Sequence, residues 1–105
     1  MSTSEQVFEQ RMKDLGLDAP RLTPQSIEDV IVKAEYYVYP GTQLTVCCIY
    51  LKNGFTVTGE SACASPENFN EQIGQEVAFK QAKEKIWQLE GYLLKQRLFE
   101  AQLKD

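Results

Sequence analysis

The chain has 105 residues and a mass of 12.0 kDa, with 43% hydrophobic and 25% charged residues, so we expect one globular domain spanning 1–105. Its formal net charge is -4, which excludes the overall basic field that holds a nucleic-acid backbone and leaves an acidic decoy of nucleic acid as one alternative. There is no histidine, so the commonest general base and the commonest protein metal ligand are both missing.

The first part of the chain predicts two short helices. Residues 4–14 carry a sparse apolar stripe, and Gly16 follows as a stop signal. Thr23 and Pro24 then give a start signal, because a hydroxyl stands at the cap position and a proline at the first helical position. Apolar residues at helical spacing follow, and we expect the second helix to span about 24–34.

The hydrophobic period changes after residue 35 and predicts strands. A run of tyrosine and valine over 36–39 ends at the turn signal Pro40-Gly41, and the run 43–51 is rich in β-branched and aromatic residues. Asn53-Gly54 supplies two residues that tolerate the positive φ angles of a type I′ hairpin turn. With a return strand to Cys63, these signals predict a small three-stranded antiparallel sheet.

A two-residue turn between Lys52 and Phe55 would fix the register of this hairpin. The predicted core face consists of three cross-strand pairs, which are Tyr50 with Val57, Cys48 with Gly59 and Val46 with Ser61. The opposite face, expected to be half buried or covered by a partner, carries Thr45, Cys47, Ile49 and Leu51 on the middle strand.

The C-terminal third predicts one long helical segment. Ser65-Pro66 repeats the cap and first-turn proline, and no proline occurs from residue 71 to 102. Thirty helical residues span about 45 Å, whereas a globular chain of this length has a radius of gyration of about 13 Å. We therefore expect the helix to overhang the domain, with a break at Gly91 as the alternative. The apolar residues of the overhang predict a homo-oligomer interface at Leu94, Leu98, Phe99 and Leu103.

The predicted elements make an α+β fold in which the sheet packs against the long C-terminal helix. We divide the expected domain into an N-terminal helix and loop over 1–22, a helix with antiparallel strands over 23–64, and the long helical segment over 65–105. The polar N-terminus lacks the apolar core of a signal peptide, and no apolar run approaches the length of a membrane span. We expect a cytoplasmic protein with no membrane contact.

The candidate binding residues lie in the segment that connects the last predicted strand to the long helix. Ser61, Cys63, Glu67 and Asn68 place polar groups beside the free N–H groups of a helix start, where a polar or anionic ligand can dock. The alternative is that the serine and asparagine side chains of this segment only cap the helix. Both interpretations stay open at this point.

The sequence gives little support for catalysis. The cysteines lack the paired spacing of a zinc site, so we expect no metal and no cofactor. An enzyme remains the alternative function, because Cys63 precedes a helix start that lowers a thiol pKa, and the carboxylates of Glu60 and Glu67 are close in sequence.

One stretch resembles a known family. The resemblance rests on an ordered set of residues, which is Thr45-x-Cys47, Leu51-x-Asn53-Gly54-Phe55-x-Val57-x-Gly59-x-Ser61-Ala62-Cys63, Pro66-Glu67-Asn68-Phe69, Ile73-Gly74, Ala78, Ala82 and Ile86-Trp87-x-Leu89-Glu90-Gly91-Tyr92-Leu93-Leu94. This set is similar to the family of small tailed-phage and prophage proteins founded on gene product 49 and gene product 66, over about residues 27–94. The resemblance implies a bacteriophage or prophage origin and a host-cytoplasm setting, and it assigns no catalytic residue.

We therefore expect a non-catalytic, homo-oligomeric phage accessory protein. Its expected partner is a host protein or a small polar ligand, such as an immune-signalling nucleotide, bound at the 61–70 loop. A small enzyme that depends on a cysteine or on carboxylates, and an acidic nucleic-acid decoy, are the alternatives.

Overall fold

The computed structural model describes residues 4–17 and 19–103 and confirms the α+β fold. Three helices, three strands and one 3-10 helix follow one another in the described chain. They are α1 (Ser4–Asp14), α2 (Pro24–Asp29), β1 (Ile31–Val38), β2 (Leu44–Leu51), β3 (Thr56–Ala62), the 3-10 helix η1 (Pro66–Asn68) and α3 (Glu71–Gln102).

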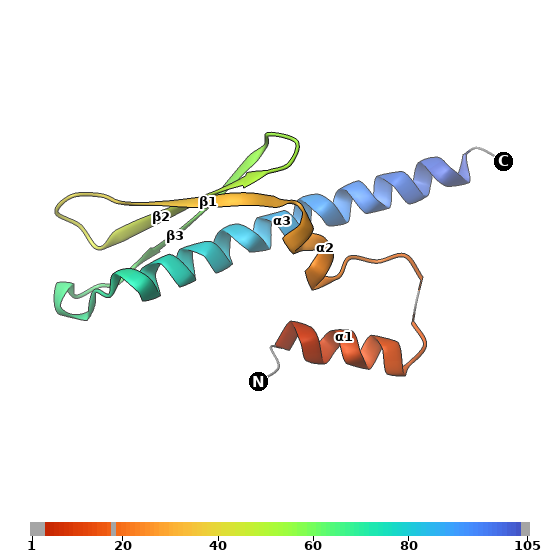
Figure 1. Cartoon of the computed structure of the whole chain (residues 1–105), viewed down its shortest axis with the longest axis horizontal. Coiled ribbons are helices and arrows are strands. Elements are labelled where there is room, and N and C mark those ends of the chain that lie inside the picture. Colours follow the sequence, from red (N-terminus) through yellow and green to blue (C-terminus); the bar gives the residue numbers. More distant parts are fainter. Residues whose placement is uncertain (1–3, 18, 104–105) are drawn as a thin grey trace.

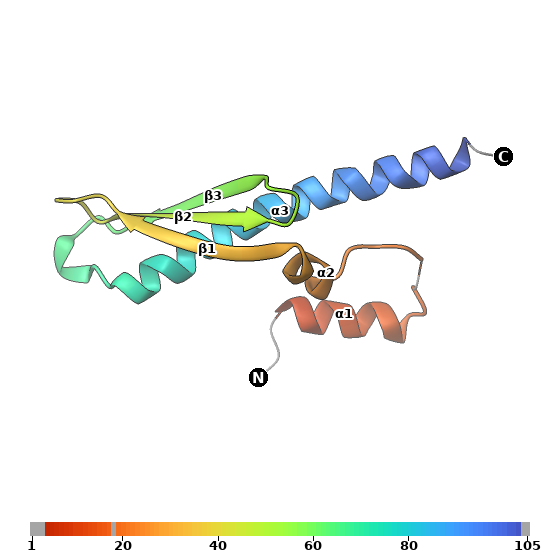
Figure 2. The same cartoon turned by 45° about the horizontal axis from the view of Figure 1, so that its top comes forward.

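The sheet is antiparallel with the strand order β1-β2-β3. Helix α3 lies across one face of this sheet and then continues well past it, as two views of the molecule show (Figures 1 and 2). The predicted sheet on a long C-terminal helix is therefore confirmed, and both outer strands, β1 and β3, are sheet edges.

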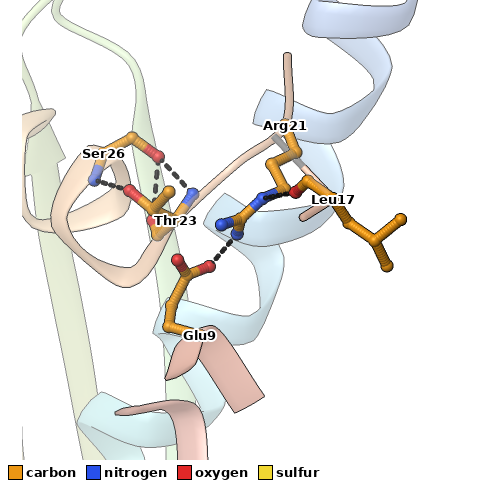
Figure 3. A network of polar contacts seen from close by, with 5 residues as sticks. All are labelled: Glu9, Leu17, Arg21, Thr23 and Ser26. Atoms are coloured by element: carbon orange, nitrogen blue, oxygen red, sulfur yellow. Dashed lines mark hydrogen bonds and ion pairs between the residues drawn. The ribbon is translucent and has the colours of Figure 1, made fainter. Parts of the chain in front are cut away.

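Helix α2 begins as the sequence predicts but ends earlier. Thr23 and Ser26 form a reciprocal capping box, in which each side chain accepts from the other residue's backbone N–H at 3.1 and 2.9 Å (Figure 3). The expected end near residue 34 is wrong, because the helix stops at Asp29 and β1 takes the chain from Ile31. The β-branched run that begins at Val30 favours a strand, and the Lys52 N–H bonds the Val30 carbonyl at 3.0 Å.

The hairpin turn lies at Asn53-Gly54, but its type and register differ from the prediction. Leu51 accepts from the Gly54 N–H and donates to the Phe55 carbonyl, both at 2.9 Å, so the loop has three residues. Only Gly54 in this loop has a positive φ, of 91°. This is a type I turn with a glycine bulge, in place of the predicted type I′ turn.

The extra loop residue shifts the register by one and exchanges the two faces of β2. The helix-facing pairs are Ile49 with Val57, Cys47 with Gly59 and Thr45 with Ser61. The face that was predicted to be half exposed is therefore the buried one, because Thr45, Cys47, Ile49 and Leu51 are all buried.

The start of the long helix also differs from the prediction. Ser65 and Pro66 open the separate 3-10 helix η1, and the Ser65 side chain makes no cap hydrogen bond there. Helix α3 begins at Glu71, where the Asn70 side chain accepts from the Ile73 N–H at 2.9 Å. The helix then runs unbroken to Gln102, so the alternative of a break at Gly91 is wrong.

Small residues let α3 approach the sheet closely. Ala78 and Ala82 of α3 are fully buried and lie over Gly59 of β3, where a Cβ atom would come within 3.0 Å of the Ala82 Cα and still closer to the Ala78 carbonyl. The core around this crossing is completed by Ile27, Cys47, Ile49, Leu51, Val57 and Ile86.

Helix α1 and the loop that follows it form an N-terminal arm, which is attached to the rest of the chain mainly by polar contacts. Helix α1 contributes no buried residue. Glu9 pairs with Arg21, whose guanidinium also donates to the Leu17 carbonyl (Figure 3). Lys83 of α3 lies 2.7 Å from Glu28 and 3.8 Å from Glu5. The arm therefore buries little apolar surface of its own.

The molecule is elongated, with principal extents of 59 × 32 × 20 Å and a radius of gyration of 17.2 Å. A compact chain of this length has a radius of gyration of about 13 Å. The excess comes from the C-terminal half of α3, which extends away from the sheet (Figure 1). None of the helices in the described part of the chain is both long and apolar enough to span a membrane.

Candidate functional site

The predicted binding segment connects the end of β3 to the start of α3. Figure 1 places this loop at the opposite end of the molecule from the C-terminus. Ser61 is on the helix-facing side of β3, and its hydroxyl donates to the Gly74 carbonyl at 2.6 Å. The strand end and the first turns of the helix are thereby tied together.

Two further contacts shape the loop itself. The Cys63 thiol donates to the Ser65 carbonyl at 3.3 Å, and the Asn68 backbone N–H donates to the same carbonyl at 3.0 Å. Both bonds close the tight 3-10 turn that carries Asn68 and Phe69 back toward α3. The Asn68 side chain is exposed, and no hydrogen bond from it is recorded to any residue that the structure describes.

A small pocket of about 140 Å³ opens between this loop and α3. Polar and apolar residues both line it, and one of them is aromatic. Its lining residues are Gln43, Ser61, Ala62, Cys63, Asn68, Phe69, Asn70, Ile73, Gly74 and Val77. Pockets that enclose a drug-sized ligand are larger, about 300–1,000 Å³. The pocket can therefore take one ring or one small polar group, and the rest of a larger ligand would lie outside it.

Three of the four predicted site residues line the pocket, namely Ser61, Cys63 and Asn68. Glu67 lies on the exposed outer side of the same turn, where it accepts a hydrogen bond from the Ser65 hydroxyl at 2.7 Å. The structure thus gathers the segment around one cavity but directs Glu67 elsewhere. Ligand binding by these residues stays a prediction.

Sequence reasoning missed several lining residues. Gln43 reaches the pocket from the position just before β2, and Ile73 and Val77 reach it from α3. Nothing near them in the sequence indicates this, because only the pairing of β2 with β3 and the lean of α3 bring them together. Phe69 and Asn70 could have been found, since both directly follow the predicted turn and Asn70 is a typical cap residue.

The comparison with family models decides the family of the chain. The model of the Phage protein (N4 Gp49/phage Sf6 gene 66) family matches residues 22–98, which is more than half of the chain. The chain belongs to this family. Comparisons with curated proteins and with solved structures gave no match.

The Gp49/gene 66 match confirms the resemblance and locates it on the structure. It covers α2, the whole sheet, the pocket and α3 as far as Leu98. Helix α1 lies outside the match, as do Phe99 and Leu103 at the far end of α3.

Two of the polar groups at this Gp49/gene 66 site are engaged by the backbone. The hydroxyl of Ser61 and the thiol of Cys63 both donate to backbone carbonyls. Within 4–17 and 19–103, no group of three His, Cys, Asp or Glu residues is arranged to hold a metal ion. Cys47 lies in the core, and burial raises the pKa of its thiol.

The charge at the outer side of the loop is stabilised locally. Two hydrogen bonds hold the pKa of the Glu67 carboxyl below its usual value. The larger effect comes from the Ser65 hydroxyl and the smaller one from the Glu67 backbone N–H. Because the pKa of the folded state is lowered, this interaction stabilises the fold above the ordinary glutamate pKa. The stabilisation is lost as the pH falls through the lowered value.

We expect Ser65→Ala to raise the pKa of the Glu67 carboxyl toward its usual value, because the hydroxyl bond is the larger of the two causes. An NMR titration that follows the Glu67 side chain measures this. Thr58→Ala removes an exposed hydroxyl from β3 and serves as the control with an unchanged Glu67 pKa. An unchanged Glu67 pKa in Ser65→Ala would contradict the assignment.

The predicted interface residues lie in two rows on α3. Leu98, Phe99 and Leu103 are 37%, 51% and 66% exposed, whereas Leu94 is half-buried. Each residue advances about 100° around a helix, so the Leu94 and Leu98 row stands about 140° from the Phe99 and Leu103 row. One partner surface cannot cover both rows.

The row of Phe99 and Leu103 extends further than the sequence indicated. Three exposed residues continue it toward the sheet, namely Leu89, Tyr92 and Leu93. Tyr92 and Leu93 follow Leu89 by three and four residues, so the three lie on one side of α3. Closer to the N-terminus of the helix, the same side packs on the sheet. We call these five residues the C-terminal stripe.

Proposed function

We propose that this member of the phage family is a non-catalytic accessory protein that acts in the host cytoplasm, self-associates, and binds a small polar ligand at the 61–70 loop. An immune-signalling nucleotide of the host is one ligand of this kind. A host protein bound at the same loop is the competing interpretation, and the experiment below distinguishes the two.

The observation that carries the proposal is the pocket between the loop and α3. It offers the exposed amide of Asn68, the ring of Phe69 and the first turn of a 32-residue helix. The Asn70 side chain satisfies the Ile73 N–H and the Asn70 carbonyl satisfies the Gly74 N–H. The N–H groups left for an acceptor are those of Glu71 and Gln72, which stand beside the lining residues in sequence but are not among them. Such N–H groups and the helix dipole favour a negatively charged or strongly polar group.

The size of the pocket supports a link between binding and self-association. A cavity of about 140 Å³ encloses only part of a nucleotide. The remaining part needs a second wall, either the outer surface of the loop or another subunit. An elongated chain with an exposed apolar stripe is suited to supply that subunit.

The test is purification of the protein from phage-infected host cells, followed by heat release and mass spectrometry of bound small molecules. We expect the double variant Asn68→Ala, Phe69→Ala to lose at least about tenfold in ligand affinity, which corresponds to about 1.4 kcal/mol. Lys80→Ala, on the exposed side of α3 outside the pocket, is the matched control and keeps the ligand.

Two outcomes would reject the proposal. The first is equal ligand content in the double variant and in Lys80→Ala. The second is a preparation that carries a stoichiometric host protein but no small molecule, which would favour the protein-binding interpretation of the same loop.

A further inference from the structure

The strand β3 is an edge of the sheet, and its register shows which backbone groups point outward. Leu51 donates to the Phe55 carbonyl, so residues 55, 57, 59 and 61 direct their backbone groups toward β2. The alternating residues Thr56, Thr58 and Glu60 direct theirs away from the sheet. This edge therefore offers a row of backbone donors and acceptors.

Helix α3 closes one end of this row. The Glu60 N–H donates to the Gln81 side-chain oxygen at 2.6 Å. This hydrogen bond confirms that the Glu60 N–H faces away from β2. Because Gln81 occupies it, the open part of the edge ends before Glu60. The open part of the edge runs from Thr56 to Thr58.

A groove lies beside the open part of the edge. Its volume is about 350 Å³, and it is lined on one side by 55–58 and on the other by Lys85, Gln88 and Leu89 of α3. Phe55 is 55% exposed and Leu89 is 43% exposed. The groove thus combines two apolar side chains with a lysine, next to the outward backbone groups of β3.

Lys85 supplies the charge that selects a partner. The other α3 lysine near the sheet, Lys83, is paired with Glu28 and Glu5, whereas no ion pair joins Lys85 to any residue in the described ranges. An acidic side chain in the groove would pair with it.

We propose that an extended peptide segment of a partner protein, with an acidic side chain flanked by apolar ones, adds to β3 as a fourth strand. Its backbone bonds Thr56 and Thr58, and its alternate side chains enter the groove beside Lys85 and Leu89. This surface is separate from the pocket at the 61–70 loop and does not depend on it.

A second copy of β3 is a poorer occupant than such a peptide. The groove side of β3 carries Val57, Gly59 and Ser61, none of which is acidic. Two copies would also bring two Lys85 side chains toward one edge. The charge of the groove therefore argues for a different chain.

The test uses the full chain and the synthetic peptide acetyl-Thr-Val-Thr-Asp-Thr-Val-amide, followed by NMR amide shifts and calorimetry. We expect shifts at Thr56 and Thr58. Binding is expected to weaken about two- to fivefold in Lys85→Glu, the effect of one exposed ion pair, and to recover when the peptide aspartate is replaced by lysine.

Backbone pairing has its own control in the peptide. Methylation of one alternate set of peptide nitrogens is expected to abolish binding, and methylation of the other set is expected to leave it intact, because only one set faces β3. Equal binding of the two methylated peptides would overturn the proposal.

The protein supplies a matched pair of edge variants. Thr58→Pro removes an outward N–H without touching the β2 ladder, and we expect at least about tenfold weaker binding. Ala34→Pro makes the same change on the opposite edge, β1, and is expected to bind normally. Unchanged binding in a folded Thr58→Pro, or loss of self-association in that variant, would reject a peptide as the occupant.

Discussion

Replacing Gly59 by alanine is expected to lower the free energy of unfolding by about 3 kcal/mol, the upper part of the range for overpacking a core. The added Cβ would overlap the backbone of α3 at Ala78 and Ala82. Backbone atoms of a packed helix cannot rotate away as a side chain can. The helix must therefore move off the sheet, and the contacts of both alanines and of Ile86 weaken together.

The measurement is urea unfolding, with the protein concentration held fixed because self-association changes the apparent stability. Gly91→Ala is the control in the same helix. There the new Cβ meets only Leu22 Cδ1, at the ordinary contact distance of 3.8 Å. Since glycine inside a helix costs about 0.5–1 kcal/mol relative to alanine, this variant is expected to be more stable by that amount.

A Gly59→Ala protein as stable as the unsubstituted chain would show that α3 does not cross β3 as closely as described. A destabilised Gly91→Ala protein would contradict the straight, unbroken path of α3 through that residue. The two substitutions are chemically identical, so their opposite expected signs isolate the effect of the crossing.

The hairpin shows why the elements were predictable and the core face was not. Asn53-Gly54 marks the turn in both the predicted and the observed loop, because each loop needs a positive φ at Gly54. The loop length decides the register, and a shift of one residue exchanges the faces. Both faces of β2 are apolar, with Val46, Cys48 and Tyr50 opposite Cys47, Ile49 and Leu51, so alternation gave no way to choose.

The start of α3 was ambiguous for a local reason. Ser65-Pro66 and Asn70 are both good start signals, and the two cap residues Ser65 and Asn70 are only five residues apart. The chain uses the first for a 3-10 turn and the second for the long helix. The bond from the Ser61 hydroxyl to the Gly74 carbonyl links sheet and helix across this loop, and no local pattern reports such a tertiary contact.

The candidate site was predictable only where it is local in sequence. Ser61, Cys63 and Asn68 surround one turn, so their proximity follows from the turn itself. Gln43 and Val77 come from a neighbouring strand and a later turn of α3. Their positions depend on the strand register, which was predicted wrongly, and on the close approach of α3 to the sheet that Gly59 permits.

That crossing also determines where the apolar surface of α3 is left uncovered. Gly74, Ala78 and Ala82 hold the first half of the helix against the sheet. The sheet ends before the helix does, and the helix direction is fixed by the crossing, so the C-terminal half of α3 extends beyond the sheet (Figure 2). The C-terminal stripe begins beside β3 at Leu89 and continues along that half. Self-association through this stripe is part of the proposed function.

The double variant Phe99→Gln, Leu103→Gln is expected to raise the dissociation constant of the oligomer at least about hundredfold. Burying an apolar side chain of this size contributes about 1.5–3 kcal/mol, and in a symmetric interface each substitution occurs in both subunits. Glutamine keeps the helix propensity high and adds no charge to the end of α3. Sedimentation velocity over a concentration series gives the dissociation constant.

Ala101→Gln is the matched control, because it introduces the same residue at an exposed position of the same helix, about 160° away from both Phe99 and Leu103. Its dissociation constant is expected to stay within about twofold of the unsubstituted protein, as for a surface substitution. A monomeric unsubstituted protein at micromolar concentration would reject self-association altogether. An oligomer that persists in the double variant but is lost in Leu94→Gln, Leu98→Gln would instead assign the interface to the other row of α3, which lies on the opposite side of the helix from the C-terminal stripe.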